Sequence, residues 1–360
     1  MMVVLLCFYG VLFAVQLQLM EKKSLISDNN HFLQLGGSLC ISPDGNYYII
    51  PDFKAGDIKI FSRESGRLLK IEGRKGVGPN ELLMPFKCTA NERYIALLDL
   101  GLRRYFIYEF VKPIGLKRID EGMPVDAGFD CAMNKGMLAL SSFIYGAHGK
   151  SYHAYGVNIK DKSITYLLPS EIKYGYSSVD EYESAYQGND IVCIGIQGYC
   201  DIYNDLLYYV WEGDLRIIRV DTSTRGIITF GKKTKNYTKP KVSSRLDRAY
   251  ANGDNVVRSE ERKKLTLVDD INVSRNYIIL SYMKPDPYLG RRVRMLQFYG
   301  HDQKLIAEIR APREISFNDE NEAISMTIEK GKDRLICMRR FLNKDETDDL
   351  YEILVYDIVK

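Results

Sequence analysis

A cysteine recurs in the same sequence frame four times, each time just before a short polar turn and a run rich in Tyr, Leu and Ile. The frames begin at Cys40 (CISPDGNYYI), Cys88 (CTANERYIAL), Cys131 (CAMNKGMLAL) and Cys200 (CDIYNDLLYY). A fifth frame has Ile271 in the cysteine position, and a looser sixth has Thr327 there. The starts are 48, 43, 69, 71 and 56 residues apart. A unit of about 45 residues therefore repeats with two long insertions, which is typical of propeller blades or solenoid units.

Each unit contains short apolar runs separated by Gly, Asp, Pro, Asn and Ser, which predicts four strands per unit. The sixth unit, from residue 323, has only three such runs, and the segment 16–26 precedes the first complete unit. We therefore predict an all-β fold, a six-bladed β-propeller with four-stranded antiparallel blades. Its N-terminal strand closes the last blade, so that no sheet edge is left bare.

A pair of stacked β-sandwiches would also show short strands at regular spacing, but the repeat in register favours the propeller. The 26 tyrosines and many β-branched residues suit pleated surfaces. Short helices are predicted only within the two insertions, over 177–187 and 259–264.

An uncharged apolar run from Val3 to Val15 is shorter than a membrane span and about as long as the apolar part of a secretion signal. It has no basic residue before it, and Leu6 stands where a lipoprotein signal ahead of Cys7 would need a small residue. We predict a signal segment at 1–15, a single propeller domain at 16–360, and a periplasmic or cell-surface location. Membrane association would come only through this signal or anchor. The alternatives are an edge strand and a wrongly assigned start.

The seven cysteines raise the question of disulfides. Equivalent positions on the inner strands of neighbouring blades point into the packing between sheets, where a small buried hydrophobe fits. We therefore predict that the four frame cysteines are free, buried thiols. Cys193 and Cys200 are the one pair near enough in sequence to suggest a disulfide.

The stretch 73–108 (GRKGVGPNELLMPFKCTANERYIALLDLGLRRYFIY) resembles an NHL-type repeat, with a glycine-rich lead-in, a proline before the inner strand and a basic hairpin. It is similar to the six-bladed TolB-like propellers that Bacteroidetes bacteria export, whose first interblade loop commonly reads G-x-G-P-G-E. Gly76, Gly78, Pro79 and Glu81 match this loop, and Asn80 replaces its third glycine. The resemblance implies the fold and export, and implies no reaction.

The glycine-rich loop could also be interpreted as a phosphate cradle, but Pro85 and a strand follow it where a cradle needs a helix N-terminus. A tight crossing between blades is the preferred interpretation. Asp52 and Asp99 recur at the ends of second strands, which indicates capping of hairpin turns.

Charge and motifs exclude several function classes. The net charge of +3 is too balanced for a dedicated nucleic-acid binder. His148 and His153 flank one hairpin without the further ligands that a metal site needs, and neither a G-x-S-x-G elbow nor an H-E-x-x-H helix is present. We assign no catalytic residue, no metal site and no cofactor.

The hairpins between second and third strands should open on the same face as the crossings between blades, because chain direction alternates within a blade. Loops on a rigid scaffold commonly bind partners. The candidate ligand-binding residues on this face are Arg103, Arg104, His148, Trp211, Tyr288, Arg291 and Arg292. A solvated rim is the alternative for each of them, and packing between blades is the alternative for Trp211.

We therefore predict a non-enzymatic, extracytoplasmic recognition module that binds a protein, peptide or glycan and no nucleic acid. The alternative is a metal-dependent propeller hydrolase or lyase, similar to lactonase-type enzymes, with its site at the central channel.

Overall fold

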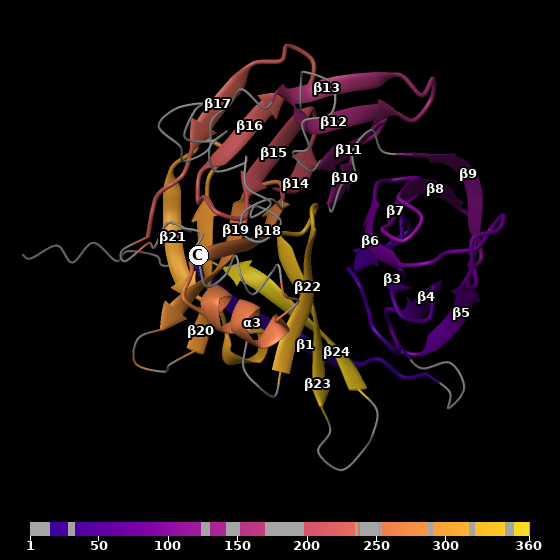
Figure 1. Cartoon of the computed structure of the whole chain (residues 1–360), viewed down its shortest axis with the longest axis horizontal. Coiled ribbons are helices and arrows are strands. Elements are labelled where there is room, and N and C mark those ends of the chain that lie inside the picture. Colours follow the sequence, from indigo (N-terminus) through magenta and orange to yellow (C-terminus); the bar gives the residue numbers. More distant parts are fainter. Residues whose placement is uncertain are drawn as a thin grey trace, which may run out of the picture.

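The computed structural model describes residues 15–27, 33–123, 130–141, 152–169, 198–234, 237, 252, 254–286, 288, 291–316, 321–342 and 349–359. These residues form six four-stranded antiparallel sheets around a central axis (Figure 1). The predicted fold class, a six-bladed β-propeller, is confirmed.

Every blade places its first strand at the axis and its fourth strand at the outer edge. Blades one to three consist of β2 (Cys40–Ile41), β3 (Tyr47–Asp52), β4 (Asp57–Ser62) and β5 (Leu68–Glu72); β6 (Pro85–Ala90), β7 (Tyr94–Asp99), β8 (Arg104–Phe110) and β9 (Leu116–Gly122); and β10 (Cys131–Met133), β11 (Met137–Ser141), β12 (Tyr152–Asn158) and β13 (Ile164–Pro169). Blades four and five consist of β14 (Gly198–Tyr203), β15 (Leu206–Trp211), β16 (Ile217–Asp221) and β17 (Ile227–Phe230), and of β18 (Leu267–Val273), β19 (Ile278–Asp286), β20 (Arg291–Tyr299) and β21 (Leu305–Arg310).

The sixth blade joins the two ends of the chain. It contains β22 (Asn321–Glu329), β23 (Arg334–Leu342) and β24 (Asp349–Val359), with β1 (Gln16–Ser24) as its outer strand. β1 runs antiparallel to β24, from Gln16 opposite Val359 to Ser24 opposite Glu352. The predicted closure by the N-terminal strand is confirmed. Val15, the last residue of the predicted signal segment, is buried in the core, and residues 1–14 lie outside the described part of the chain.

Six apolar clusters fill the six interfaces between neighbouring blades. The second strands show why, because successive side chains of a strand point to opposite faces of its sheet. In β3, Tyr48 and Ile50 pack against blade six, whereas Ile49 between them packs against blade two. Both faces of these strands are buried, which explains why they are nearly continuous apolar runs.

The frame cysteines behave as predicted. Cys40, Cys88, Cys131 and Cys200 are buried, free thiols on the first strands of blades one to four. The helix predicted at 259–264 is present and begins four residues earlier, as α3 (Asn255–Lys263), whereas 177–187 lies outside the described residues. A 3-10 turn, η2 (Arg313–Ile315), precedes blade six. No helix in the described part of the chain is long and apolar enough to cross a membrane.

Candidate functional site

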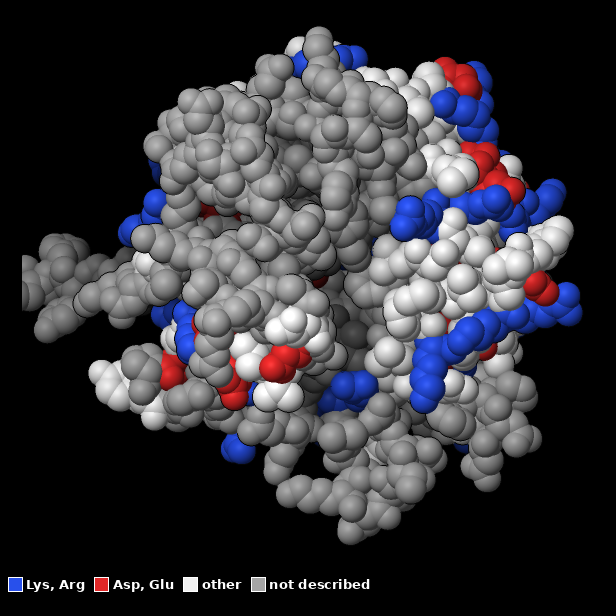
Figure 2. Space-filling view, viewed as in Figure 1, with Lys and Arg blue, Asp and Glu red and all other residues white. Residues whose placement is uncertain are grey.

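The two ends of the propeller differ. We call one end the crossing face, because it carries the crossings between blades and the hairpins between second and third strands. The other end, the short-turn rim, carries the hairpins between first and second strands and between third and fourth strands. α3 belongs to the crossing from blade four to blade five and lies toward the viewer in Figure 1, so Figures 1 and 2 look at the crossing face.

Two predicted arginines lie on the β7–β8 hairpin of the crossing face. Arg103 is exposed and occupies a turn position with a φ of 52°, and Arg104 begins β8. A guanidinium nitrogen of Arg104 lies 3.8 Å from a carboxylate oxygen of Glu121, and both side chains are 42% exposed. Such a pair is worth little energetically, so Arg104 can exchange it for a partner's acceptor.

The β19–β20 hairpin carries the next three predicted residues. Tyr288, at its tip, is 94% exposed, and its backbone N–H donates to the Asp286 carboxylate. The backbone of Arg291 pairs with that of Asp286, which extends the hairpin to the end of both strands. Arg292 is partly buried, with a guanidinium nitrogen 3.5 Å from the Met283 carbonyl oxygen. Of Tyr288 and Arg292, the two predicted residues of this hairpin whose side chains the structure describes, Tyr288 is the more accessible.

Trp211 ends β15 and is 6% exposed. Its indole belongs to the apolar cluster between blades three and four, together with Ala154, Leu168 and Ile218. This placement favours packing between blades, the alternative kept for Trp211 from the sequence. His148 lies outside the described residues.

The most exposed apolar side chains form a pattern that the sequence analysis did not anticipate. Val77, Met123, Val256 and Tyr288 are each at least 68% exposed, and no other large hydrophobic residue in the described ranges exceeds 51%. All four lie on the crossing face, in the crossings from blade one to two, two to three and four to five and in the β19–β20 hairpin. The remaining exposed hydrophobics mostly lie on the outer strands.

The glycine-rich loop is a closed crossing. A carboxylate oxygen of Glu81 accepts a hydrogen bond of 2.7 Å from the Gly78 backbone, and the other accepts one of 2.8 Å from the Arg74 guanidinium. A Cβ on Gly76 would come within 2.1 Å of the Glu81 carboxylate. The carboxylate thus occupies the space that a phosphate would need, and Asn80 takes the positive φ of 62° that the third glycine of the motif would supply.

Asp52 and Asp99 cap turns, as predicted, and also anchor the preceding crossings. The Asp99 carboxylate accepts hydrogen bonds from the N–H of Leu102 in the hairpin and from those of Leu83 and Met84 in the crossing. Asp52 does the same in blade one and is joined by the buried ammonium of Lys59 at 2.9 Å. Although burial raises the pKa of Asp52, the Ala55 N–H and Lys59 hold that pKa below its ordinary value.

A cavity of about 710 Å³ lies on the axis and is walled by the first strands of the blades. Its rim is formed by hairpins between first and second strands, which places its mouth at the short-turn rim. These hairpins contribute Pro43, Gly45, Asn91, Glu92, Asn134, Lys135, Asn204, Asp205, Lys330 and Gly331. The volume falls in the range of sites for small ligands.

The inner wall of the cavity carries buried charges. The Lys87 ammonium lies 2.7 Å from an Asp130 carboxylate oxygen, and these side chains are 19% and 2% exposed. Asp270 faces the cavity from β18 and is buried. Burial lowers the pKa of Lys87, but the Asp130 and Asp270 carboxylates outweigh it and hold that pKa well above its ordinary value. Burial raises the pKa of Asp270 to about 7.

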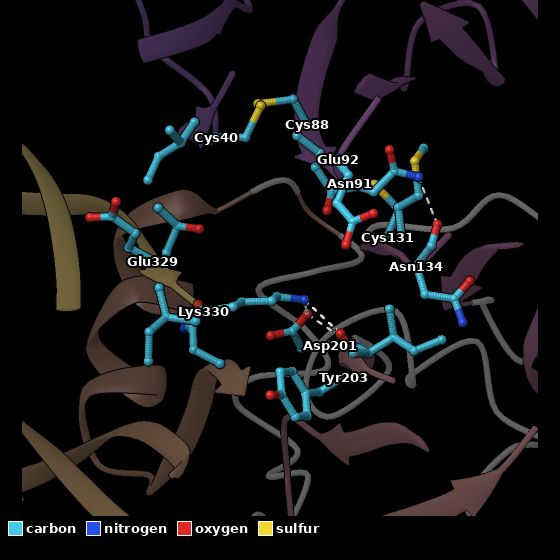
Figure 3. Close-up of a pocket in the computed structure, with 18 of the residues that line it drawn as sticks. Cys40, Cys88, Asn91, Glu92, Cys131, Asn134, Asp201, Tyr203, Glu329 and Lys330 are labelled. Carbon is cyan, nitrogen blue, oxygen red and sulfur yellow. Dashed lines mark hydrogen bonds and ion pairs between the residues drawn. The ribbon is translucent and has the colours of Figure 1, made fainter. Parts of the chain in front are cut away.

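Polar side chains also connect neighbouring blades around the channel. Asp130 accepts a hydrogen bond of 2.7 Å from the Cys200 backbone, and Asp201 accepts one of 2.7 Å from that of Val273. At the rim, the Asn91 amide donates to the Asn134 carbonyl at 2.7 Å (Figure 3). Lys330 reaches across to Asp201 at 2.8 Å, as the dashed lines in Figure 3 show. The cavity wall is therefore held in place from blade to blade, as a binding site requires.

The charged wall was not predicted from the sequence. Lys87, Asp130 and Asp270 each stand directly before the first residue of a repeat frame, so the repeat itself contained the signal. The first strands of the six blades line the axis. Three charged residues at the same position of these strands therefore cannot all face bulk solvent.

The described residues contain no group of three or more His, Cys, Asp and Glu side chains placed to hold a metal ion. His301 joins blades four and five, with one ring nitrogen 3.1 Å from the Tyr208 hydroxyl and the other 2.9 Å from the Ser274 carbonyl oxygen.

No protein-family model and no curated protein matches the sequence. Among solved structures, the chain is similar to a Bacteroides fragilis protein whose name proposes that it is exported, with 16% identity, a TM-score of 0.62 and 96% of each chain covered. It is also similar to U3-55K, with 11% identity and a TM-score of 0.54 over 92% of this chain and 98% of the other. Hydrazine synthase of Kuenenia stuttgartiensis gives 8% identity and a TM-score of 0.51 over 88% and 78%. At these identities the similarity shows a likeness of fold alone.

Proposed function

We propose that this protein is a non-enzymatic, extracytoplasmic recognition module whose crossing face binds a protein, peptide or glycan partner. The observation that carries the proposal is the placement of Val77, Met123, Val256 and Tyr288, the most exposed apolar side chains in the described ranges, on that one face. Single exposed hydrophobic residues are ordinary. Four such residues from four separate segments at one end of a propeller support a surface that a partner covers.

The charges near these side chains suit such a partner. Figure 2 shows Lys and Arg side chains in stripes on the side where Figure 1 draws blades one and two. Arg74, Arg103 and Arg104 belong to crossings and hairpins of these blades, and Arg291 and Arg292 follow Tyr288 in the sequence of blade five. An aromatic ring with neighbouring guanidinium groups can stack on a sugar or peptide and donate hydrogen bonds to it. Because Trp211 is buried, the proposed surface is centred on Tyr288 and does not include the indole.

We further propose that the chain is of the NHL/TolB-like type and that residues 1–15 act as an export segment. The match of Gly76, Gly78, Pro79 and Glu81 to the interblade loop of that group supports the type. The apolar run from Val3 to Val15, together with the name of the Bacteroides fragilis structure, supports export.

The test is to find a partner by glycan array, peptide array and photo-crosslinking from position 288 in exporting cells, and then to measure its affinity for surface variants. The double variant Tyr288→Ser with Val77→Ser should bind more than tenfold more weakly. The matched control, Leu69→Ser with Ile306→Ser, changes exposed apolar residues on outer strands and should bind as the wild type does. Equal affinity of both double variants would overturn the proposal.

A further inference from the structure

The axial cavity at the short-turn rim has a second chemical character, an excess of negative charge. Each of its lining lysines has a carboxylate partner: Lys87 has Asp130 at 2.7 Å, Lys330 has Asp201 at 2.8 Å, and Lys135 has Glu92 at 3.7 Å. Two lining carboxylates, those of Asp270 and Asp205, form no ion pair within the described ranges. Asp205 is exposed at the mouth, whereas Asp270 lies at the inner wall.

Asp270 is more than nine-tenths buried and faces the cavity. One of its carboxylate oxygens accepts a hydrogen bond of 2.9 Å from the next backbone N–H, that of Ile271, and the Asn272 side chain also contacts the carboxylate. The charged groups around it are Lys87, Asp130 and Asp269, and Asp269 is paired with Arg294 at 2.8 Å. The Lys87 ammonium thus faces two carboxylates, Asp130 and Asp270, so the buried set lacks one positive charge.

A buried carboxylate without a full counter-charge is costly, and its raised pKa reports that cost. A ligand that places a cation beside Asp270 would offset the cost of burying this carboxylate, so Asp270 favours the binding of a cationic ligand. Asn272, two residues along the same strand, emerges on the same side as Asp270, and Thr327 lines the cavity from the neighbouring first strand. Both offer further oxygen acceptors for an N–H donor.

Part of the remaining wall is apolar and uncharged. It includes Cys40, Cys88, Cys131, Cys200, Ile271 and Met326. Burial holds the pKa of Cys131 and that of Cys200 well above the ordinary value, so these two thiols are neutral. A cavity of about 710 Å³ with such walls is too roomy for a bare ion and suits a methylene chain.

We propose that the axial cavity binds a primary alkylammonium group, as carried by a linear polyamine or by a lysine side chain, with the ammonium against Asp270 and the methylene stem along the thiol and aliphatic wall. This site lies at the opposite end of the channel from the crossing face. Its success or failure is therefore independent of the proposed recognition surface.

Isothermal titration calorimetry at pH 8 with n-butylammonium, n-butanol and n-butyrate tests the chemistry, because the three probes share a stem and differ in charge. Of the three probes, we expect only n-butylammonium to bind, with a saturable one-to-one isotherm. Asp270→Asn, which keeps the shape and removes the charge, should weaken it at least tenfold. The control Glu64→Gln removes one carboxylate from the exposed β4–β5 hairpin and should change nothing.

Spermidine and Nα-acetyl-lysine amide then distinguish the two sources of the alkylammonium group, a linear polyamine and a lysine side chain. Binding of either compound that depends on Asp270 supports the site and identifies the class of its ligand. The carboxyl ¹³C signal of Asp270, which should move on titration, gives a readout independent of the variants. The proposal is overturned if butylammonium fails to saturate, if butanol or butyrate binds equally well, if a divalent cation binds while the amines do not, or if Asp270→Asn keeps the wild-type affinity.

Discussion

The Lys87 ammonium nitrogen lies 2.7 Å from an Asp130 carboxylate oxygen and so joins blade two to blade three at the wall of the channel. Asp130 in turn accepts the Cys200 N–H of blade four, so one lysine fixes a carboxylate on which the next blade depends. Asp270 of blade five is the second carboxylate that this lysine faces. The channel wall is thus a charged network spanning four blades, and its members should be strongly coupled in stability.

Removing the lysine should expose that coupling. Lys87→Met leaves Asp130 and Asp270 buried without their common cation, and should lower the free energy of unfolding by about 3–5 kcal/mol. The double variant Lys87→Met with Asp130→Asn should recover most of this lost free energy of unfolding, because it removes one of the two unpaired buried carboxylates. Urea denaturation followed by fluorescence measures both. A double variant no more stable than Lys87→Met would contradict the coupling.

Asp270→Asn should stabilise the protein in a pH-dependent way. The folded-state pKa of Asp270 is raised to about 7 by burial, whereas an unfolded aspartate titrates near 4. The folded state therefore holds the proton over this interval, and the contribution of Asp270 to stability falls as pH rises from about 4 to about 7. The gap in melting temperature between variant and wild type should be near zero at pH 4 and largest at pH 8.

The exposed substitution Asp302→Asn is the control for that titration, because its carboxylate lies in a hairpin of the outer strands. The difference in melting temperature between Asp302→Asn and the wild type should not widen comparably between pH 4 and pH 8. If Asp270→Asn shows a gap that is constant with pH, the buried carboxyl does not titrate as the structure indicates.

The repeat frame predicted the fold because it marks one register on every first strand, and the register determines which residues are buried. It could not predict which charged side chains pair between neighbouring blades. Lys87 and Asp130 are 43 positions apart in sequence, and the packing of blade two against blade three brings their strands together. The candidate face was derived from chain direction, which is sound for placing loops. Chain direction alone does not say which way a side chain at the end of a strand points. It therefore could not predict that the Trp211 indole packs between the blades.

Trp211→Ala should therefore act on stability. The indole is 6% exposed within the cluster between blades three and four, so its removal leaves a cavity and should cost about 3–5 kcal/mol. Tyr288→Ala, at a side chain that is 94% exposed, should stay within about 0.5 kcal/mol of the wild type. Thermal melts of the two single variants decide the matter. A Trp211→Ala variant that melts with the wild type would show that the indole does not hold these blades together.

The closure of the ring by β1 should be essential to cooperative unfolding. A chain that begins at residue 25 loses the strand from Gln16 to Ser24, leaves the edge of β24 unpaired, and loses the ion pair of 3.1 Å between Lys22 and Glu352. An unpaired edge of a long strand is a site of aggregation. Compared with a chain that begins at residue 15, this variant should melt at a much lower temperature over a broader transition.

A synthetic peptide of residues 15–26, added in excess, should restore part of the difference in melting temperature by pairing with β24, because main-chain hydrogen bonds can be supplied by a separate strand. A peptide with Leu17 and Leu19 changed to Asp should restore less, since Leu17 packs against the core beside Tyr356. Equal melting temperatures of the two chains would show that blade six is stable with three strands and that the ring does not depend on its N-terminal strand.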